Sequence, residues 1–236
     1  KVGVVTFNPM PKMFFNKKLK NFKLMNLSQK IYQFKKQKVD FLINQKFTKR
    51  FSKIKAEVFI TKYLKKKIKT KVLFVSNNFR FGNNREGDVN LLKSYEKQSN
   101  YKLIIPSPLK KNNKIISSTE IRKLLSNGNL SRANKYLSRK WEIEGRVQKG
   151  RRVGGKIGFA TCNIDIGNYI IAKPGVYSVK VTLDNIKNKI NGIANLGFRP
   201  TFNQNKILLE VNLFNFNRNI YNKKLAVEFI KFIRRE

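Results

Sequence analysis

The sequence predicts two domains of different fold class: a doubly wound α/β domain with a parallel sheet, followed by a small antiparallel β-barrel. Two observations lead to this prediction. Up to about residue 137, short β-branched apolar runs alternate with segments of helical periodicity, which is the pattern of strand–helix–strand units. From Trp141 onward, short alternating runs between turn residues replace the helical pattern, as in a barrel or sandwich. We therefore expect domains at residues 1–137 and 138–236.

The first domain is expected to contain short apolar strands with helices between them. The strands are expected at residues 2–7, 39–43, 72–75 and 103–105. The helices are expected at 28–36, with Ser28 as N-cap, at 56–66 and at 91–98. Ligands of such sheets bind at the carboxyl ends of the strands, so the loops at 8–11 and 77–88 are expected to face one.

The loop at 77–88 contains two glycines, two arginines and two phenylalanines. Aromatic faces could stack on a ring, and arginines could bind phosphate. An ordinary surface loop with phenylalanines anchored in the core remains the alternative.

A further helix is expected to begin at Ser117, which has capping-box spacing to Glu120. Its buried residues are expected to be Ile121, Leu124 and Leu125, and Gly128 ends it. A helix N-terminus with three hydroxyl residues is also a potential anion site, so a phosphate site and a simple capped helix both remain open.

The second domain has expected strands at 142–147, 175–183, 189–196, 207–216 and 225–232. Within the fourth strand, Leu209, Val211 and Leu213 face one way, whereas Glu210 and Asn212 face the other. Glu210 could act as a general base for a hydroxyl nucleophile. The alternative is an ordinary exposed carboxylate.

A glycine-rich stretch at residues 150–163 begins with four glycines in nine residues and ends with Thr161 and Asn163. Glycine lets backbone amides approach a bulky ligand. Thr161 and Asn163 project to the same side of an extended chain. Amides followed by two neutral oxygen ligands suit a nucleotide phosphate with Mg²⁺; a flexible surface turn is the alternative.

The composition is strongly basic, with 52 Lys and Arg against 13 Asp and Glu and a net charge of +39. A nucleic-acid partner is one explanation; the spread of lysines over the whole chain favours a general compositional bias. The absence of histidine excludes histidine bases, histidine metal sites and Ser-His-Asp triads. A single cysteine suits a reducing cytoplasm, and no apolar run approaches the ~20 residues of a membrane span.

Taken in order, these motifs resemble the bacterial bifunctional riboflavin kinase/FMN adenylyltransferase (FAD synthetase) family along essentially the whole chain. The stretches that carry the resemblance are 5–11, 78–88, 116–122, 150–163, 191–202 and 210–214. The resemblance implies a Rossmann-like nucleotidyltransferase domain followed by a riboflavin kinase β-barrel, with ATP, riboflavin and FMN as substrates.

For the barrel, the resemblance implies transfer of the γ-phosphoryl group of ATP to the ribityl hydroxyl of riboflavin. Glu210 would be the catalytic base, and Thr161 and Asn163 would hold Mg²⁺. The residues implied to bind ATP and its phosphates are Gly150, Gly154, Lys156, Gly158, Phe159, Thr161 and Asn163.

For the first domain, the resemblance implies transfer of AMP from ATP to FMN, which gives FAD and pyrophosphate. The implied phosphate-binding residues are Ser117, Ser118, Thr119 and Arg122. The implied flavin-side loop contributes Asn78, Phe81, Gly82, Arg85 and Asp88.

The sequence departs from the family pattern at several places. Met10 stands where the family usually has histidine, Asn77 lies in a usually more acidic loop, and Gly155, Ala160 and Cys162 replace an arginine, a proline and an alanine. The family's histidine-containing loop and C-terminal helix lie outside these 236 residues, so the chain is expected to be a fragment. Phosphorylation is therefore the activity expected here, with weakened flavin binding, and adenylylation is expected of a longer chain.

Two other functions remain open: a basic nucleic-acid-binding protein, and an inactive remnant that binds nucleotide or flavin. We expect the chain to bind small-molecule substrates, and we expect neither a specific nucleic acid nor a membrane as its partner.

Overall fold

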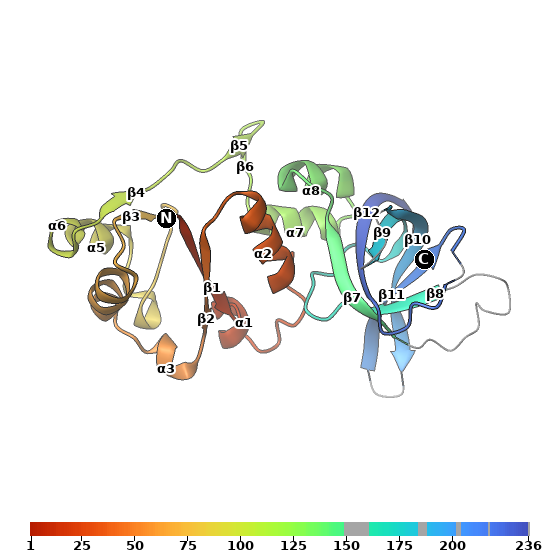
Figure 1. Ribbon diagram of the computed structural model, residues 1–236, viewed down its shortest axis with the longest axis horizontal. Helices are drawn as coiled ribbons and strands as arrows, with labels where there is room; N and C mark the ends of the chain where they lie inside the picture. Colours follow the sequence, from red (N-terminus) through yellow and green to blue (C-terminus); the bar gives the residue numbers. More distant parts are fainter. Residues whose placement is uncertain (149–160, 184–187, 202–203, 217, 236) are drawn as a thin grey trace. The chain divides into compact units, whose positions relative to one another are not determined.

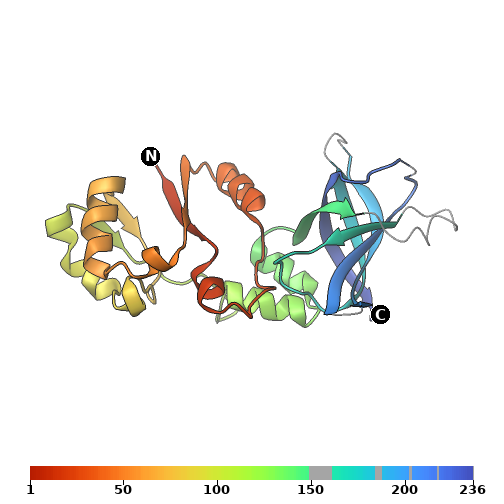
Figure 2. The ribbon, with the colours of Figure 1, turned by 90° about the horizontal axis from the view of Figure 1, so that it is seen from below.

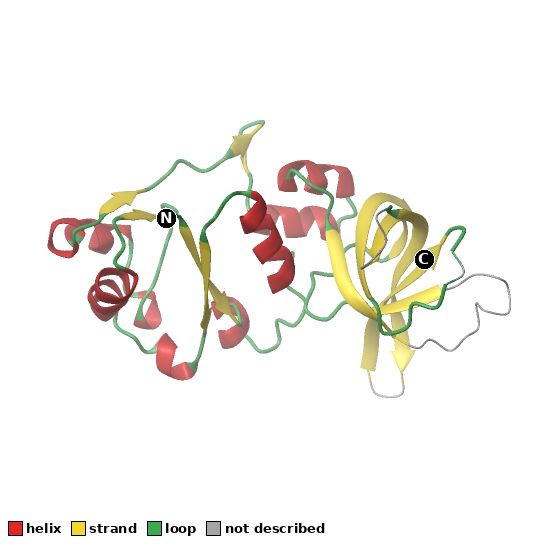
Figure 3. Cartoon of the chain, viewed as in Figure 1, coloured by secondary structure: helices red, strands yellow, loops and turns green. Residues whose placement is uncertain are grey.

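The computed structural model describes residues 1–148, 161–183, 188–201, 204–216 and 218–235 (Figure 1). The chain forms two compact units. The first comprises Lys1–Lys18 and Asp40–Ile116, and the second comprises Leu19–Val39 and Ser117–Glu236. The expected boundary between residues 137 and 138 marks a change of secondary structure: after α8 (Leu130–Leu137), the described residues form strands and loops (Figure 3).

The first unit contains parallel strands joined by helical segments, as expected. Strand β1 (Gly3–Asn8) pairs with β2 (Phe41–Lys46), and β3 (Val72–Phe74) pairs with β4 (Lys102–Ile104), both in parallel. Among the described residues these are two separate two-stranded sheets, whereas the sequence pattern predicts one parallel sheet. Strands β2 and β3 follow one another in the chain but do not pair, so the two pairs stay separate.

Short elements complete the first unit. They are α1 (Pro11–Phe15), α3 (Lys49–Ser52), α4 (Ala56–Val58), η1 (Phe59–Ile68), η2 (Asn83–Arg85), α5 (Val89–Ser94), α6 (Glu96–Ser99), β5 (Lys110–Lys111) and β6 (Lys114–Ile115). The helix expected at 56–66 is therefore one α-helical turn followed by a π-helix. Ile60 and Leu64 are buried in the core of this unit, whereas Val58 is exposed.

The second unit contains a closed six-stranded barrel, which confirms the expected fold class (Figures 1 and 2). Its strands are β7 (Glu142–Gln148), β8 (Thr161–Asp165), β9 (Gly175–Leu183), β10 (Ile190–Thr201), β11 (Gln204–Leu213) and β12 (Lys224–Arg234). They close in the order β10-β11-β8-β7-β12-β9, and every pair is antiparallel. In this closed order each of the described strands has a neighbouring strand on both sides.

Among its described residues, the same unit has three helices: α2 (Leu27–Lys36), α7 (Ser118–Ser126) and α8. Ser28 was expected to cap α2, but the N-cap is Asn26, in a capping box with Gln29. Ser28 instead lies inside the first turn and donates a hydrogen bond to Glu144 on β7 at 2.7 Å. The Trp141 indole also donates to the Leu24 carbonyl at 3.0 Å, so residues before α2 are part of this unit.

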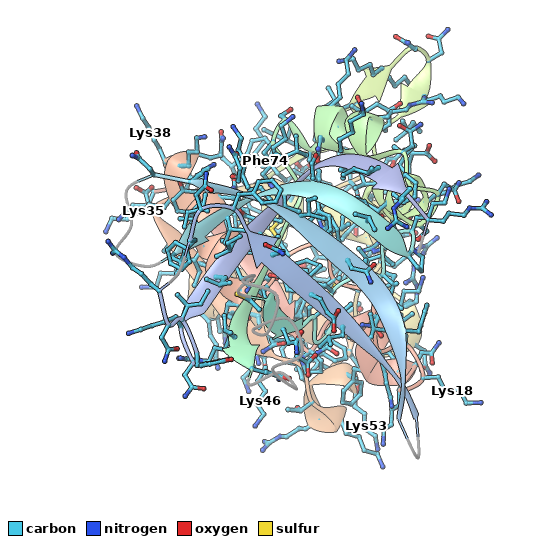
Figure 4. The ribbon with its side chains drawn as sticks, turned by 90° about the vertical axis from the view of Figure 1, so that its right-hand side faces the viewer. Lys18, Lys35, Lys38, Lys46, Lys53 and Phe74 are labelled. Carbon is cyan, nitrogen blue, oxygen red and sulfur yellow. The ribbon has the colours of Figure 1, made fainter. Side chains whose placement is uncertain are left out.

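The excess of positive charge lies at the surface. The labelled side chains of Lys18, Lys35, Lys38, Lys46 and Lys53 are exposed and extend outward from the ribbon (Figure 4). Lys35 lies on α2 and Lys46 on β2, whereas the other three lie in turns and loops, and both units are represented. Within the described ranges, no helix combines the length and the apolar character needed to cross a membrane.

Candidate functional site

The candidate site lies on the barrel wall where β8 and β11 run side by side. Glu210 on β11 is the direct cross-strand partner of Asn163 on β8, and Asn212 is the partner of Thr161. Directly opposed residues of an antiparallel pair have Cβ atoms about 4.5–5.5 Å apart. The fold therefore brings the expected base next to one of the expected cation ligands.

Strand alternation places this polar surface on the outside of the barrel. Leu209 and Val211 are 0% exposed and belong to the core, as the sequence pattern predicts. Successive side chains point to opposite faces of a strand, so Glu210 and Asn212 point outward. Asn163 is nevertheless only 9% exposed, so its amide lies in a covered position rather than in open solvent.

Two asparagines for which the sequence predicts no role in the site also lie here. Asn195 on β10 is the cross-strand partner of Glu210 on the side away from β8. Asn212 has a buried Oδ1 that makes no hydrogen bond within the described part of the chain. Leaving a buried acceptor unpaired costs about 1–3 kcal/mol. The alternation of residues 208–213 already placed Asn212 on the face of Glu210, and that pattern was the available signal.

The expected phosphate loop lies outside the described residues. Gly150, Gly154, Lys156, Gly158 and Phe159 belong to residues 149–160. Thr161, the first described residue after this loop, begins β8.

The donor set at this surface fits a hard divalent cation. Mg²⁺ prefers oxygen ligands and keeps several waters, and it often shares its remaining positions with substrate phosphates. Four side chains here carry oxygen atoms that can ligate a metal: Thr161, Asn163, Glu210 and Asn212. The Asn212 oxygen also accepts no hydrogen bond from the described part of the protein. Among the described residues there is no cluster of three or more histidine, cysteine or acidic residues that could hold a metal by itself.

Cys162 lies between Thr161 and Asn163 but faces the other way, into the barrel. It is 2% exposed, and burial raises the pKa of its thiol to about 11. A thiol that stays protonated at neutral pH is a poor nucleophile, so Cys162 is a packing residue.

The expected flavin-side loop is held by local structural contacts. Phe81 is in the core of the first unit and stacks on Phe79. Gly82 has φ +78°, and a Cβ there would lie 2.8 Å from Ala56. The Asp88 carboxylate accepts a hydrogen bond from the Leu91 amide at 2.9 Å and caps α5.

Two remaining members of this loop have polar neighbours or unusual backbone. The Asn78 amide oxygen accepts a hydrogen bond from Ser76 at 2.9 Å. Arg85 has a positive φ of 61° in η2. The contacts of Phe81, Gly82 and Asp88 and the Ser76–Asn78 hydrogen bond therefore hold this loop within the first unit.

The expected phosphate-binding residues of the first activity lie at the start of α7. Ser117 caps the helix by accepting a hydrogen bond from the Glu120 amide at 3.2 Å, while Ser118 and Thr119 are exposed. Arg122 donates from Nε to the Phe22 carbonyl at 2.8 Å, and its guanidinium lies 3.6 Å from the Phe22 ring centroid. Burial lowers the pKa of Arg122. This helix belongs to the second unit, and the loop at 77–88 belongs to the first.

Comparison with known proteins matches both halves of the chain. A family model of FAD synthetase matches residues 1–120, and one of riboflavin kinase matches residues 137–236. A crystal structure described as a macrolide-efflux protein from Streptococcus pneumoniae shares the fold, with a TM-score of 0.83 and 27% identity over 99% of this chain and 76% of that chain.

Three relatives bear the name bifunctional riboflavin kinase/FMN adenylyltransferase. The relative from Buchnera aphidicola subsp. Schizaphis graminum is 39% identical over 99% of this chain and 75% of its own length. The Haemophilus influenzae relative is 37% identical over 100% of this chain and 76% of its own length. The Escherichia coli K12 relative is 32% identical over 100% of this chain and 75% of its own length. Two matching domain models in this order and full-length relatives above 30% identity lead to one conclusion: the chain belongs to the bifunctional riboflavin kinase/FMN adenylyltransferase family.

Proposed function

We propose that the barrel phosphorylates riboflavin with ATP, which gives FMN and ADP. The observation that carries the proposal is the register between β8 and β11, which sets Glu210 directly opposite Asn163. A base and a cation ligand must lie within one substrate's reach for phosphoryl transfer, because such catalysis depends mainly on positioning and charge stabilisation.

Glu210 is proposed to accept the proton of the ribityl hydroxyl as that oxygen attacks the γ-phosphorus. The bond from the γ-phosphorus to the bridging oxygen of ADP breaks, and ADP leaves with that electron pair. The position of Glu210 on the outer face of β11, partly exposed, leaves its carboxylate open to a substrate. Thr161 and Asn163 are proposed to hold Mg²⁺, which would neutralise charge on the phosphates when bound.

The test is riboflavin phosphorylation by the Glu210→Gln variant. Removing a general base costs on the order of 10²–10⁴-fold in rate, so kcat should fall by at least about a hundredfold. Glu228→Gln is the matched control, since Glu228 is another barrel carboxylate and pairs with Lys189. Native-like turnover by Glu210→Gln would remove Glu210 from the mechanism.

The second proposed function is adenylylation of FMN, supported by the FAD synthetase match over residues 1–120. Ser117, Ser118, Thr119 and Arg122 are proposed to bind phosphates, and the loop at 77–88 is proposed to lie at the flavin. The chain has no histidine, so we expect these residues alone to accumulate FMN with little FAD. Chromatography of the flavins formed from riboflavin and ATP measures both products, and FAD as the main product would contradict this expectation.

The domain boundary at residues 137/138 is also proposed as the functional division, with the kinase in residues 138–236. The segments Leu19–Val39 and 117–137 are grouped structurally with the barrel.

A further inference from the structure

We propose that the amide oxygen of Asn212 is a third protein ligand, with Thr161 and Asn163, for the divalent cation that accompanies ATP in the barrel. This inference rests on the proposed kinase function. It adds a residue to which neither the family resemblance nor the motif pattern gives a role.

The register supplies the first argument. Asn212 is the direct cross-strand partner of Thr161, just as Glu210 is the partner of Asn163. The four positions therefore form two adjacent cross-strand pairs, two residues apart along each strand. Asn212 is thus next to one proposed cation ligand and diagonal to the other.

The state of the Asn212 side chain supplies the second argument. Its Oδ1 is buried and has no hydrogen-bond partner within the described ranges. The cross-strand neighbour on its other side is Ile193, which offers no donor. Buried polar atoms in proteins are almost always paired, and an unpaired acceptor on a binding surface is satisfied by a ligand that supplies a hydrogen-bond donor or a positive charge.

The chemistry of the ligand follows from the groups present. An amide oxygen is a hard, neutral donor of the kind that Mg²⁺ and Mn²⁺ bind. A phosphate oxygen would be repelled by this acceptor, so the phosphates cannot be its direct partner. A divalent cation that arrives with the triphosphate binds a hard oxygen ligand and, unlike a phosphate oxygen, is attracted to it.

The experiment measures Mn²⁺ binding by electron paramagnetic resonance, on the whole chain with ADP present. The barrel component is defined as the bound Mn²⁺ that is lost in Asn163→Leu. Removing even an outer-shell partner of a metal ligand typically weakens metal binding about 10–100-fold, so Asn212→Leu should weaken this component at least about tenfold. Asn212→Asp should strengthen it, because a carboxylate replaces a neutral ligand at the same position.

Thermal unfolding separates a ligand role from a structural one. Asn212→Leu removes an unpaired buried acceptor, so its melting temperature should equal or exceed that of the native chain. Asn191→Leu is the matched control, because Asn191 is exposed on β10 and is paired in register with Lys180, away from Glu210; it should leave Mn²⁺ binding unchanged.

Unchanged Mn²⁺ binding in Asn212→Leu would overturn the proposal, whether or not the melting temperature of that variant falls. If Asn212→Leu does not fold, the isosteric Asn212→Asp decides: binding no stronger than native overturns the proposal. Riboflavin phosphorylation by the native chain is measured in parallel. A native chain that makes no FMN overturns the proposed function together with this inference, whereas native FMN formation with unaltered Mn²⁺ binding in both variants overturns the inference alone.

Discussion

Asn134 joins α8 of the second unit to β12 and to Trp141, the residue just before β7, and replacing it tests how that unit is held together. The side chain is 7% exposed. Its Oδ1 accepts a hydrogen bond from the Trp141 amide at 2.7 Å, and its Nδ2 donates to the Phe229 carbonyl at 3.2 Å. Trp141 and Phe229 are both 0% exposed, and their rings lie 4.8 Å apart. One amide thus satisfies two buried backbone groups.

Asn134→Leu keeps the volume of the side chain and removes both hydrogen bonds. Each buried group left without a partner costs about 1–3 kcal/mol, so the two together should lower the free energy of unfolding by about 2–6 kcal/mol. Most domains are stable by only about 5–15 kcal/mol. The substitution should therefore shift unfolding to clearly lower denaturant concentrations.

Urea unfolding followed by tryptophan fluorescence is the assay. The chain has one tryptophan, and Trp141 lies in the second unit, so the signal reports that unit even though a chain of two units need not unfold in one step. Asn191→Leu, at an exposed position on β10, is the control and should change little. A loss below about 0.5 kcal/mol for Asn134→Leu, the range of ordinary surface substitutions, would refute the reasoning.

Three further predictions concern the Glu144 carboxylate, the Cys162 thiol and the net positive charge of the chain. Burial alone would raise the pKa of Glu144, but hydrogen bonds from Lys224, Asn26 and Ser28 lower this pKa overall. The ionised Glu144 therefore stabilises the fold fully above the unfolded pKa of about 4.3. This stabilisation is lost as the pH falls through the lower pKa of the folded state. Glu144→Gln should make unit stability less dependent on pH below about 5, and an unchanged acid profile would contradict the assignment. The Cys162 thiol, with its pKa raised to about 11 by burial, should resist a thiol reagent at pH 8 in the folded chain and react fully in urea; rapid labelling of folded protein would show that it is accessible. Binding to duplex DNA should fall steeply with salt and show no sequence preference, and a sequence-specific complex that survives high salt would revive the nucleic-acid hypothesis.

The local sequence pattern was sufficient to predict which side chains are buried wherever burial depends on strand alternation or helix periodicity. Period-two alternation placed Leu209 and Val211 in the barrel and Glu210 outside it, and both leucine and valine are fully buried. The helix that begins at Ser117 buries Ile121, Leu124 and Leu125 as the pattern predicts. Strand alternation and helix periodicity are properties of the backbone itself, so they can be read without knowing what packs against them.

Competition between nearby side chains was less predictable. Ser28 and Asn26 are both good N-cap residues, and the sequence favoured the first. In the structure Glu144, which is distant in sequence, accepts hydrogen bonds from both, and Asn26 also caps the helix. The capping box between Asn26 and Gln29 is a local signal, whereas Ser28 donates to Glu144 on a barrel strand that is distant in sequence.

The sequence by itself determined the fold classes, their order along the chain and the outward direction of Glu210 and Asn212. Only the tertiary structure decided that β8 lies beside β11, with Glu210 opposite Asn163 and Asn212 opposite Thr161. It also decided that Leu19–Val39 belongs with the barrel. The physical reason is that partner and register are set by closing the whole barrel, in which every strand must satisfy its hydrogen bonds and bury its apolar face at once, and no single stretch of sequence contains that condition.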